Sequence, residues 1–410
     1  MYLAASRARQ DTCDPAPPSG GRRVAGPVIA LGAVSLVTDL SSEMVAAVLP
    51  LYLVLGLGLS PFQFGLLDGL YTGATALVRL AGGHAADRWR RHKLVAGSGY
   101  ALSAAAKLGL LLAGGSTPAL SAAVAADRVG KGIRTGPRDA LISLNTAEPF
   151  LGRAFGVHRA MDTTGALLGP LAAFAVLWLT AGAYDAVFVV SFCWAVLGVL
   201  VLVAFVPGRT SSSGGSAVTL RSTLRLLARP AFRRVLVAAA LLGLVSVTDG
   251  FLYLVLQERL DLDVAHFPLL PLGSALVYLL LAVPLGRVAD RVGRGRLYLF
   301  GHVALLGVYA ALLAPLGGVA LTVVVLVLHG SYYAATDGVL MALGGVLVPE
   351  DRRAGGLALL QTGQATGRLV AALGFGAVWT LWGMSAALVV AGCALAVVLA
   401  GVALVVKEVR

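Results

Sequence analysis

The stretch GRVADRVGRGRL, residues 286–297, repeats an earlier stretch of the same chain, GGHAADRWRRHKL at residues 82–94. Four residues of each copy match at a constant separation: Gly83, Asp87, Arg88 and Arg91 in the first copy, and Gly286, Asp290, Arg291 and Arg294 in the second. Two further pairs of landmarks follow the same order: VSLVTD (ending at Asp39) with LVSVTD (ending at Asp249), and EPFLGRAFG with PEDRRAGG. Three ordered pairs predict a chain of two homologous halves.

The composition predicts a membrane protein. The chain has 410 residues, of which 58% are hydrophobic and 13% are charged, and its mean hydropathy is +0.86. A soluble protein carries about 25% charged residues. Apolar runs of about 20 residues cross a hydrocarbon core of ~30 Å as helices. Twelve such spans are expected near residues 26–55, 62–84, 94–113, 118–143, 154–179, 184–206, 235–256, 265–286, 296–315, 318–346, 355–380 and 384–406.

The net charge of +12 raises the question of a nucleic-acid partner, but the positions of the basic residues argue against one. Arginine and lysine gather at alternate ends of the spans, whereas the opposite side has only Arg259. This is the positive-inside pattern, so we expect a multi-pass protein of the cell inner membrane with both termini in the cytoplasm. The polar residues 1–25 lack the features of a removable signal peptide. The three cysteines have no metal-site or redox spacing.

The expected organisation has five parts: a cytoplasmic tail over 1–25, a six-helix bundle over 26–207, a cytoplasmic linker over 208–234, a second six-helix bundle over 235–406, and a cytoplasmic C-terminus over 407–410. The linker begins GRTSSSGGS and continues LRSTLRLLARPAFRR, in which arginines recur every four residues. This second segment predicts a short helix on the cytoplasmic leaflet, where membrane lipid with anionic headgroups attracts the arginines.

Twelve spans, two halves, a central loop and a G-x-x-x-D-R-x-G-R-type loop after spans two and eight together resemble the major facilitator superfamily of secondary transporters. The resemblance covers residues 26–406, although the first loop has Arg90 where the family usually has glycine. It implies an all-α membrane protein with twelve transmembrane helices in two pseudo-symmetric bundles. The bundles rock around a central binding cavity, in a protein that usually acts as a monomer. The eight matched loop residues are expected to act as conformational latches that hold one state.

The fourth span contains DRVGKGIRTGPRDALI, residues 127–142, which is unusually rich in charge. Each charge near the middle of a membrane costs at least ~2.5 kcal/mol on insertion scales, so these side chains must meet water, partner charges or a ligand. Asp127, Arg128 and Lys131 lie deeper in the span and favour a role in the cavity. The remaining charges, Arg134, Arg138 and Asp139, approach the interface and favour fixed ion pairs.

The resemblance also implies that spans one, four, seven and ten surround the pathway of substrate and protons. The pathway set is then Asp39, Glu43, Asp127, Arg128, Lys131, Asp249, His329, Tyr333 and Asp337. Asp39 or Asp249 is predicted to take up and release the coupling proton, since desolvation disfavours the charged carboxylate. Glu43 and Asp337 are the next candidates for carrying the coupling proton. The alternatives are permanent pairing of these acids with Arg128 or Lys131, and a packing role for His329 and Tyr333.

The fifth span contains GALLGP, residues 165–170, which resembles a G-x-x-x-G-P signature of exporters in this superfamily. Gly165, Gly169 and Pro170 permit close helix packing and a kink. We therefore predict proton-coupled export, by antiport, of a small organic or anionic compound, with no cofactor. Proton-coupled uptake and a non-transporting scaffold or sensor remain open, while the absence of catalytic motifs such as H-E-x-x-H argues against an enzyme.

Divalent metal efflux is a further alternative. The fourth-span stretch resembles a segment of a poorly characterised group of prokaryotic superfamily members, some of them related to nickel or cobalt exporters. Asp39, Glu43 and His329 would then supply oxygen and nitrogen ligands. The basic fourth span and the scattered histidines argue against this alternative.

Overall fold

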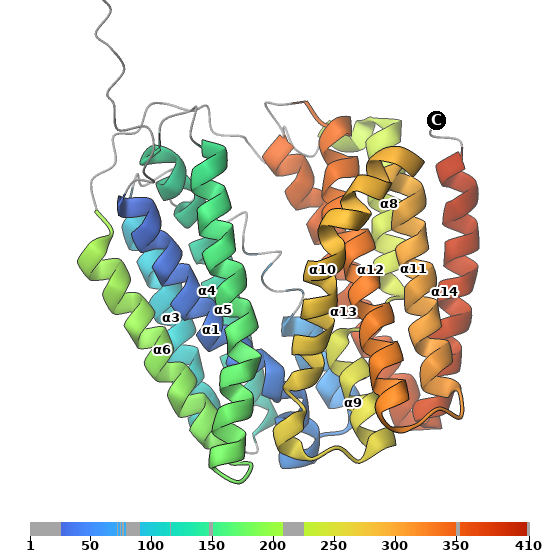
Figure 1. Ribbon diagram of the computed structural model, residues 1–410, viewed down its shortest axis with the longest axis horizontal. Helices are drawn as coiled ribbons and strands as arrows, with labels where there is room; N and C mark the ends of the chain where they lie inside the picture. The colour runs from blue at the N-terminus through green and yellow to red at the C-terminus, as the bar shows by residue number, and fades with distance from the viewer. Residues whose placement is uncertain are drawn as a thin grey trace, which may run out of the picture.

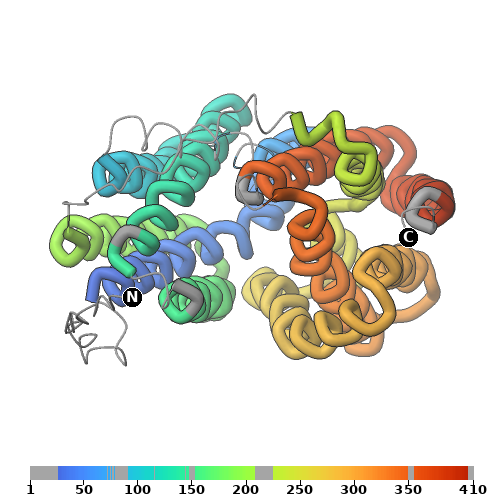
Figure 2. Tube along the Cα trace, turned by 90° about the horizontal axis from the view of Figure 1, so that it is seen from above, coloured from blue at the N-terminus to red at the C-terminus, as the bar shows by residue number. Residues whose placement is uncertain are grey.

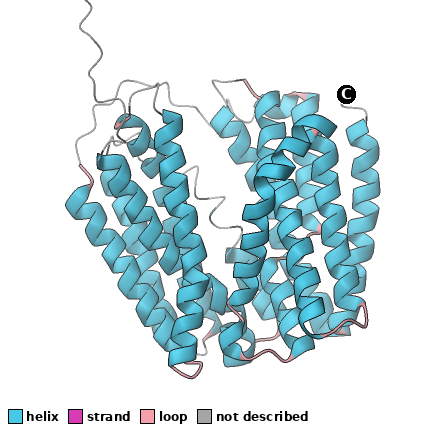
Figure 3. Ribbon diagram, viewed as in Figure 1, coloured by secondary structure: helices cyan, strands magenta, loops and turns pink. Residues whose placement is uncertain are grey.

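The computed structural model is built from helices and the turns that join them, and the residues it describes contain no strand (Figures 1 and 3). It describes residues 26–71, 73, 75, 78, 91–114, 116–146, 151–207, 225–349 and 353–407. An all-α fold is what the long apolar spans predict, because a helix satisfies all of its backbone hydrogen bonds within one segment.

The N-terminal half forms one bundle. Its helices are α1 (Gly26–Leu51, continued by the π-helical turn η1, Tyr52–Gly56), a helical segment over 61–71, α3 (His92–Leu112), α4 (Thr117–Leu144), α5 (Leu151–Leu179) and α6 (Tyr184–Phe205). Helix α1 packs against α5 and α6, and α3 packs against α4 and α6.

The C-terminal half forms a second bundle beside the first (Figure 2). Its elements are η3 (Arg225–Ala228), α8 (Pro230–Leu244), α9 (Asp249–Leu260), η4 (Val264–His266), α10 (Leu269–Val292), α11 (Arg294–Leu313), α12 (Gly318–Leu347), α13 (Arg353–Trp382) and α14 (Met384–Lys407). Helix α12 packs against α10 and α11, and α13 packs against α8.

Nine stretches among the described residues are long and apolar enough to cross a membrane, and they coincide with nine of the twelve predicted spans. The other three predicted spans correspond to α4, to α13 and to the helical segment 61–71. The residues that follow this segment are only partly described. These two helices have 28 and 30 residues, which exceeds the length a span needs. Helix α4 falls short in apolarity, because it carries the charged stretch that the sequence singled out.

The predicted seventh span is discontinuous. Helix α8 ends at Leu244 and α9 begins at Asp249, with Thr248 in extended conformation between them. The hydroxyl of Tyr309 on α11 accepts a hydrogen bond from the backbone N–H of Val247 at 2.8 Å, which satisfies one of the groups that the break frees. Inside a membrane such a break requires a partner of this kind.

The linker differs from the prediction in its described part. Residues 225–234 form the 3-10 turn η3 and the first residues of α8 instead of one amphipathic helix. Pro230 stands at the start of α8, where its fixed backbone angle suits a helix and its missing N–H costs nothing. Leu226 is buried. Residues 208–224 lie outside the described part.

The two bundles touch at the end of the molecule that is opposite the two termini. There Phe64 packs edge-on against Phe251 with ring centroids 4.8 Å apart, and Phe174 lies 5.8 Å from the ring of His266. The backbone N–H of Phe62 donates to Thr380 at 3.0 Å. The described helices of the two bundles diverge toward the start of α1 and the end of α14 (Figure 1).

Candidate substrate and proton site

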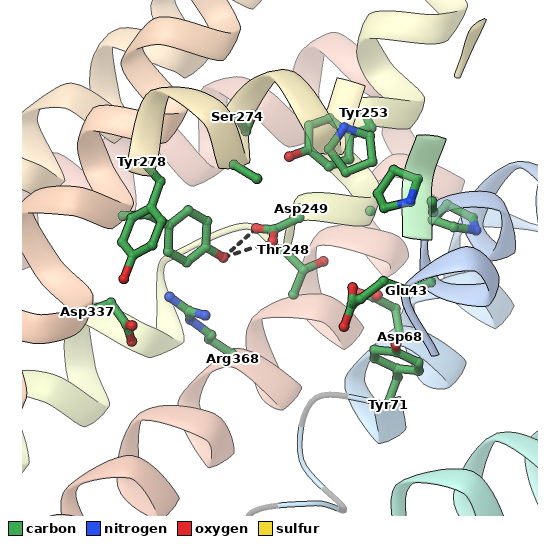
Figure 4. A pocket seen from close by; sticks show the side chains of 18 of the residues that line it. Glu43, Asp68, Tyr71, Thr248, Asp249, Tyr253, Ser274, Tyr278, Asp337 and Arg368 are labelled. Atoms are coloured by element: carbon green, nitrogen blue, oxygen red, sulfur yellow. Dashed lines mark hydrogen bonds between the residues drawn. The ribbon is translucent and has the colours of Figure 1, made fainter. Parts of the chain in front are cut away.

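A cavity of about 630 Å³ lies between the bundles. Its lining comes from α1, the segment 61–71, α4 and α5 on one side, and from α9, α10, α12, α13 and the break before α9 on the other (Figure 4). Six members of the predicted pathway set line it: Glu43, Arg128, Lys131, Asp249, Tyr333 and Asp337. Asp39, Asp127 and His329 are buried outside the lining set.

Asp127 is held between two cations in the wall formed by α3 and α4. Its Oδ1 lies 3.1 Å from Nζ of Lys107, and its Oδ2 accepts from Nε of Arg128 at 3.0 Å. The guanidinium of Arg128 also lies 3.7 Å from the ring centroid of Tyr71. The Lys107 side chain is only 2% exposed, so this group of charges is shielded from water. Asp127 thus forms fixed ion pairs with Lys107 and Arg128 and holds the guanidinium of Arg128 in place.

Lys131 and Glu43 face each other across the cavity wall more loosely. Nζ of Lys131 lies 3.8 Å from Oε1 of Glu43, and their side chains are 29% and 32% exposed. An ion pair at this distance and exposure contributes little to stability, about 0–1 kcal/mol. Both side chains therefore remain available to a ligand.

Asp39 lies inside the N-terminal bundle and not in the cavity. Its Oδ1 accepts from Nη2 of Arg134 at 3.2 Å, and Nη1 of Arg134 donates to the Thr38 hydroxyl at 2.8 Å. The Arg134 side chain is 3% exposed. The sequence predicts Arg128 or Lys131 as the partner of a paired Asp39, but the rotation of α4 presents Arg134 instead.

The neighbouring charges extend this group on the α5 side. Arg138 lies 3.5 Å from Asp162 and donates to the hydroxyl of Ser35 at 3.2 Å. Ser35 in turn lies 2.9 Å from Nε2 of His158. Arg134 and Arg138 thus join α1, α4 and α5, in the structural role expected for them from their place in the span.

Asp249 has partners of a different kind. Its two carboxylate oxygens accept hydrogen bonds from the hydroxyl of Tyr333 at 2.7 and 2.8 Å, and Nε2 of His329 lies 3.3 Å from Oδ1. On its other side, Nδ1 of His329 lies 3.2 Å from the Ser274 hydroxyl and 3.4 Å from the Tyr253 hydroxyl. Among the described residues, the ion pairs of Asp249 include no arginine or lysine.

Several residues outside the predicted set also line the cavity: Asp68, Tyr71, Arg159, Tyr253, Ser274, Tyr278 and Arg368. Nη2 of Arg368 donates to the hydroxyl of Tyr332 at 2.9 Å, and Figure 4 shows Arg368 beside Asp337. Asp68 carries the signal that also selected Asp39, an ionisable residue inside an apolar span. The tyrosines give no such signal, because they pack equally well in a bundle core.

The predicted latch residues fall partly outside the described part of the chain, since residues 79–90 include Gly83, Asp87 and Arg88. Arg91 is exposed just before α3. In the second copy, Nη2 of Arg294 lies 3.2 Å from Asp290 and Nη1 donates to the Ala342 carbonyl at 3.1 Å. These contacts link α10, α11 and α12. Gly286 and Arg291 belong to the last turns of α10.

The glycines of GALLGP lie where α5 packs closely on α1. A Cβ atom on Gly165 would lie 2.2 Å from the carbonyl oxygen of Leu36, and one on Gly169 would lie 2.6 Å from Cβ of Glu43. Pro170 lies within α5 and lines the cavity. Larger residues at the two glycine positions would push α5 away from α1.

The three residues proposed as metal ligands are not brought together. Asp39 pairs with Arg134, Glu43 with Lys131, and His329 contacts Asp249. Within the described ranges, no three His, Cys, Asp or Glu side chains form a group that could hold a metal ion.

Two helical bundles around a polar cavity define a membrane transporter. The chain belongs to the Major Facilitator Superfamily, whose family model matches residues 31–277 and 250–410. It is a multi-pass membrane protein and a secondary transporter of small molecules, and not an enzyme.

Among curated relatives, an uncharacterized MFS-type transporter of Methanocaldococcus jannaschii is 29% identical over 369 residues, which cover 88% of this chain and 90% of the relative. An uncharacterized protein of Mycobacterium bovis is 34% identical over 157 residues, or 38% of each chain.

Solved structures of transporters share the fold. The nucleoside transporter NupG matches with a TM-score of 0.78 at 15% identity, covering 93% of this chain and 100% of its own. An inward-facing bacterial homolog of the human lysosomal transporter Spinster matches with a TM-score of 0.72 at 15% identity, covering 92% and 95%.

Proposed function

We propose that this protein is a proton-coupled exporter in which the Asp249–His329 pair carries the coupling proton and a small organic compound occupies the cavity. The observation that carries this proposal is the set of partners around Asp249. A carboxylate beside a histidine and a tyrosine hydroxyl contacts groups that themselves donate or accept protons.

The other acids of the pathway set are less suited to this role. Asp39 and Asp127 are locked by Arg134 and by Lys107 with Arg128, and protonating either would leave a buried cation without its partner. Such a loss costs about 3–5 kcal/mol. Asp249 instead contacts His329 and Tyr333, so a proton can join or leave its carboxylate without leaving a buried, permanently charged partner unpaired.

The size of the cavity supports a small organic substrate. A volume of about 630 Å³ lies within the range of roughly 300–1,000 Å³ that holds compounds of drug size. With both termini in the cytoplasm, as the charge pattern indicates, the side toward which the described helices diverge faces the cytoplasm, and the protein loads its substrate there as a monomer. The close packing of α5 on α1 at Gly165, Gly169 and Pro170 supports the export direction.

The test uses everted membrane vesicles whose interior is acidified by respiration, with an acridine dye that reports the pH gradient. Compounds from a panel of organic anions, amines and amphoteric molecules are added to vesicles with the wild-type protein. Exchange of a compound for protons restores the dye fluorescence. We expect this response with the wild type and with Asp185→Asn, an exposed acid at the start of α6, but not with Asp249→Asn or His329→Gln.

Wild-type proton movement in Asp249→Asn would overturn the role of this residue. Compound transport that is indifferent to the pH gradient, or a wild type that responds to no compound, would overturn proton-coupled export. Entry of compound together with protons in right-side-out vesicles would show uptake instead.

A further inference from the structure

The cavity presents charges of both signs. Among the residues that the structure describes, eight formally charged side chains line it, four basic and four acidic: Arg128, Lys131, Arg159 and Arg368, and Glu43, Asp68, Asp249 and Asp337. Five tyrosines share the described lining: Tyr71, Tyr253, Tyr278, Tyr332 and Tyr333. A cavity for a simple anion or a simple cation would carry an excess of the opposite charge, and the described lining does not.

Apart from Asp68, these charges are largely not neutralised against each other. Among the described ion pairs of the other seven, the only one that joins two of them is the loose contact of Lys131 with Glu43 at 3.8 Å. Arg128 is held from behind by Asp127, and Arg159 lies 3.3 Å from Asp162, which is not part of the lining. Arg128, Arg159 and Asp249 therefore have ionic partners outside the lining and still face the cavity.

The balance of the two signs differs between the bundles. Among the described lining residues, the N-terminal bundle supplies more basic than acidic side chains, and the C-terminal bundle supplies more acidic than basic ones. The first set is Arg128, Lys131 and Arg159 with Glu43 and Asp68, and the second is Asp249 and Asp337 with Arg368. A ligand with a single charge would be attracted by one wall and repelled by the other. A ligand with two opposite charges would be attracted by both walls at once, and it would bridge the two bundles.

We infer that the substrate is amphoteric, with an amine that binds at Asp249 and a carboxylate or phosphate that binds at Lys131 and Arg128. Its body lies between the tyrosines. This inference rests on the proposed function and adds a mechanism to it. The amine and the proton compete for the same carboxylate, so the arrival of one releases the other, which is the requirement for exchange.

The test measures ligand binding without any gradient, as thermal stabilisation of the purified full-length protein. A matched set of probes keeps one ring and varies the charge: para-(aminomethyl)benzoate, para-methylbenzylamine and para-methylbenzoate. A second set, with charges further apart, compares phenylalanylglycine with its N-acetylated and its C-amidated forms. We expect the amphoteric member of at least one set to bind about tenfold more tightly than either single-charge member.

Variants of Asp249 and Lys131 test which residue binds the amine of the probe and which binds its carboxylate. Asp249→Asn should remove the contribution of the amine, so that para-(aminomethyl)benzoate binds no better than para-methylbenzoate. Lys131→Met should remove the contribution of the carboxylate, so that the same probe binds no better than para-methylbenzylamine, and Lys131→Arg should restore it. Asp185→Asn, whose carboxylate is exposed away from the cavity, serves as the control that leaves all affinities unchanged.

The inference is overturned if a single-charge probe binds as tightly as its amphoteric partner, or if neither amphoteric probe stabilises the protein. Because no pH gradient is present, these outcomes leave proton coupling intact. Conversely, an amphoteric preference together with flux that ignores the gradient would overturn the proposed function alone.

Discussion

The two halves of this transporter carry nearly the same hexapeptide, and the two copies fold differently. VSLVTD, residues 34–39, continues without interruption inside α1, where the Thr38 hydroxyl donates to the Val34 carbonyl at 2.7 Å. LVSVTD, residues 244–249, contains the break between α8 and α9. The final aspartate of the first copy pairs with an arginine, whereas that of the second contacts a tyrosine and a histidine.

The residues that follow and face each copy account for the difference. Leu40 follows the first copy, and Gly250 follows the second inside the first turn of α9. A Cβ on Gly250 would lie 2.8 Å from the ring of Phe64, so glycine admits the segment 61–71 beside the second copy. Across from the second copy, Tyr309 receives the freed N–H of Val247. The comparison teaches that the partners of the motif, more than the motif itself, decide whether its aspartate lies in an ion pair with arginine or beside a tyrosine and a histidine.

The largest effect should come from replacing Asp249 with asparagine, and the same replacement at Asp39 provides the comparison. Asp249→Asn removes the exchangeable carboxylate, and we expect proton-driven flux to fall to the level of vesicles without the protein. Asp39→Asn keeps a hydrogen-bonding side chain next to Arg134, and we expect it to retain flux at reduced stability. Flux in reconstituted vesicles checks both variants, and equal loss in the two would break the comparison.

Breaking the fixed pair of the first copy should have the next largest effect, and on stability. Asp39→Ala leaves Arg134, 3% exposed at its side chain, without a carboxylate, at a cost of about 3–5 kcal/mol. Chemical denaturation in detergent measures the change. The double variant Asp39→Leu with Arg134→Leu should recover most of the loss, whereas additive losses would show that the two residues act independently.

The break of the second copy should depend on Tyr309. Tyr309→Phe removes the acceptor for the N–H of Val247 and leaves a buried donor unsatisfied, at a cost of about 1–3 kcal/mol. Amide hydrogen exchange around residues 245–248 should rise in this variant. Unchanged exchange and stability would mean that the break persists without the Tyr309 contact.

The smallest effect is expected at Ser35, which is the serine of the first copy. Ser35→Ala removes one contact from Arg138 and one with His158, and we expect a loss of about 1 kcal/mol with unchanged proton coupling. A thermal unfolding series measures it. A loss of coupling in this variant would extend the proton path into the N-terminal bundle.

The sequence predicted those features that depend on hydropathy and repetition. The twelve spans and the two halves follow from apolar runs and from the paired loops, and placing Asp249 and Lys131 at the cavity required only the resemblance to a known fold. The partner of Asp39 was not predictable, because Arg134 and Lys131 lie less than one turn apart on α4, and a small rotation selects one over the other. The break before Asp249 has its hydrogen-bond partner in Tyr309, which lies 62 positions from Val247 along the chain, and local propensity shows only the glycine that follows the break.

The measurement that tests the central claim most directly is the release of protons into weakly buffered solution when a transported compound binds to the purified protein. Wild type, Asp39→Asn and Asp249→Asn are compared. We expect proton release from wild type and Asp39→Asn and none from Asp249→Asn. Proton release that disappears in Asp39→Asn and persists in Asp249→Asn would contradict the claim.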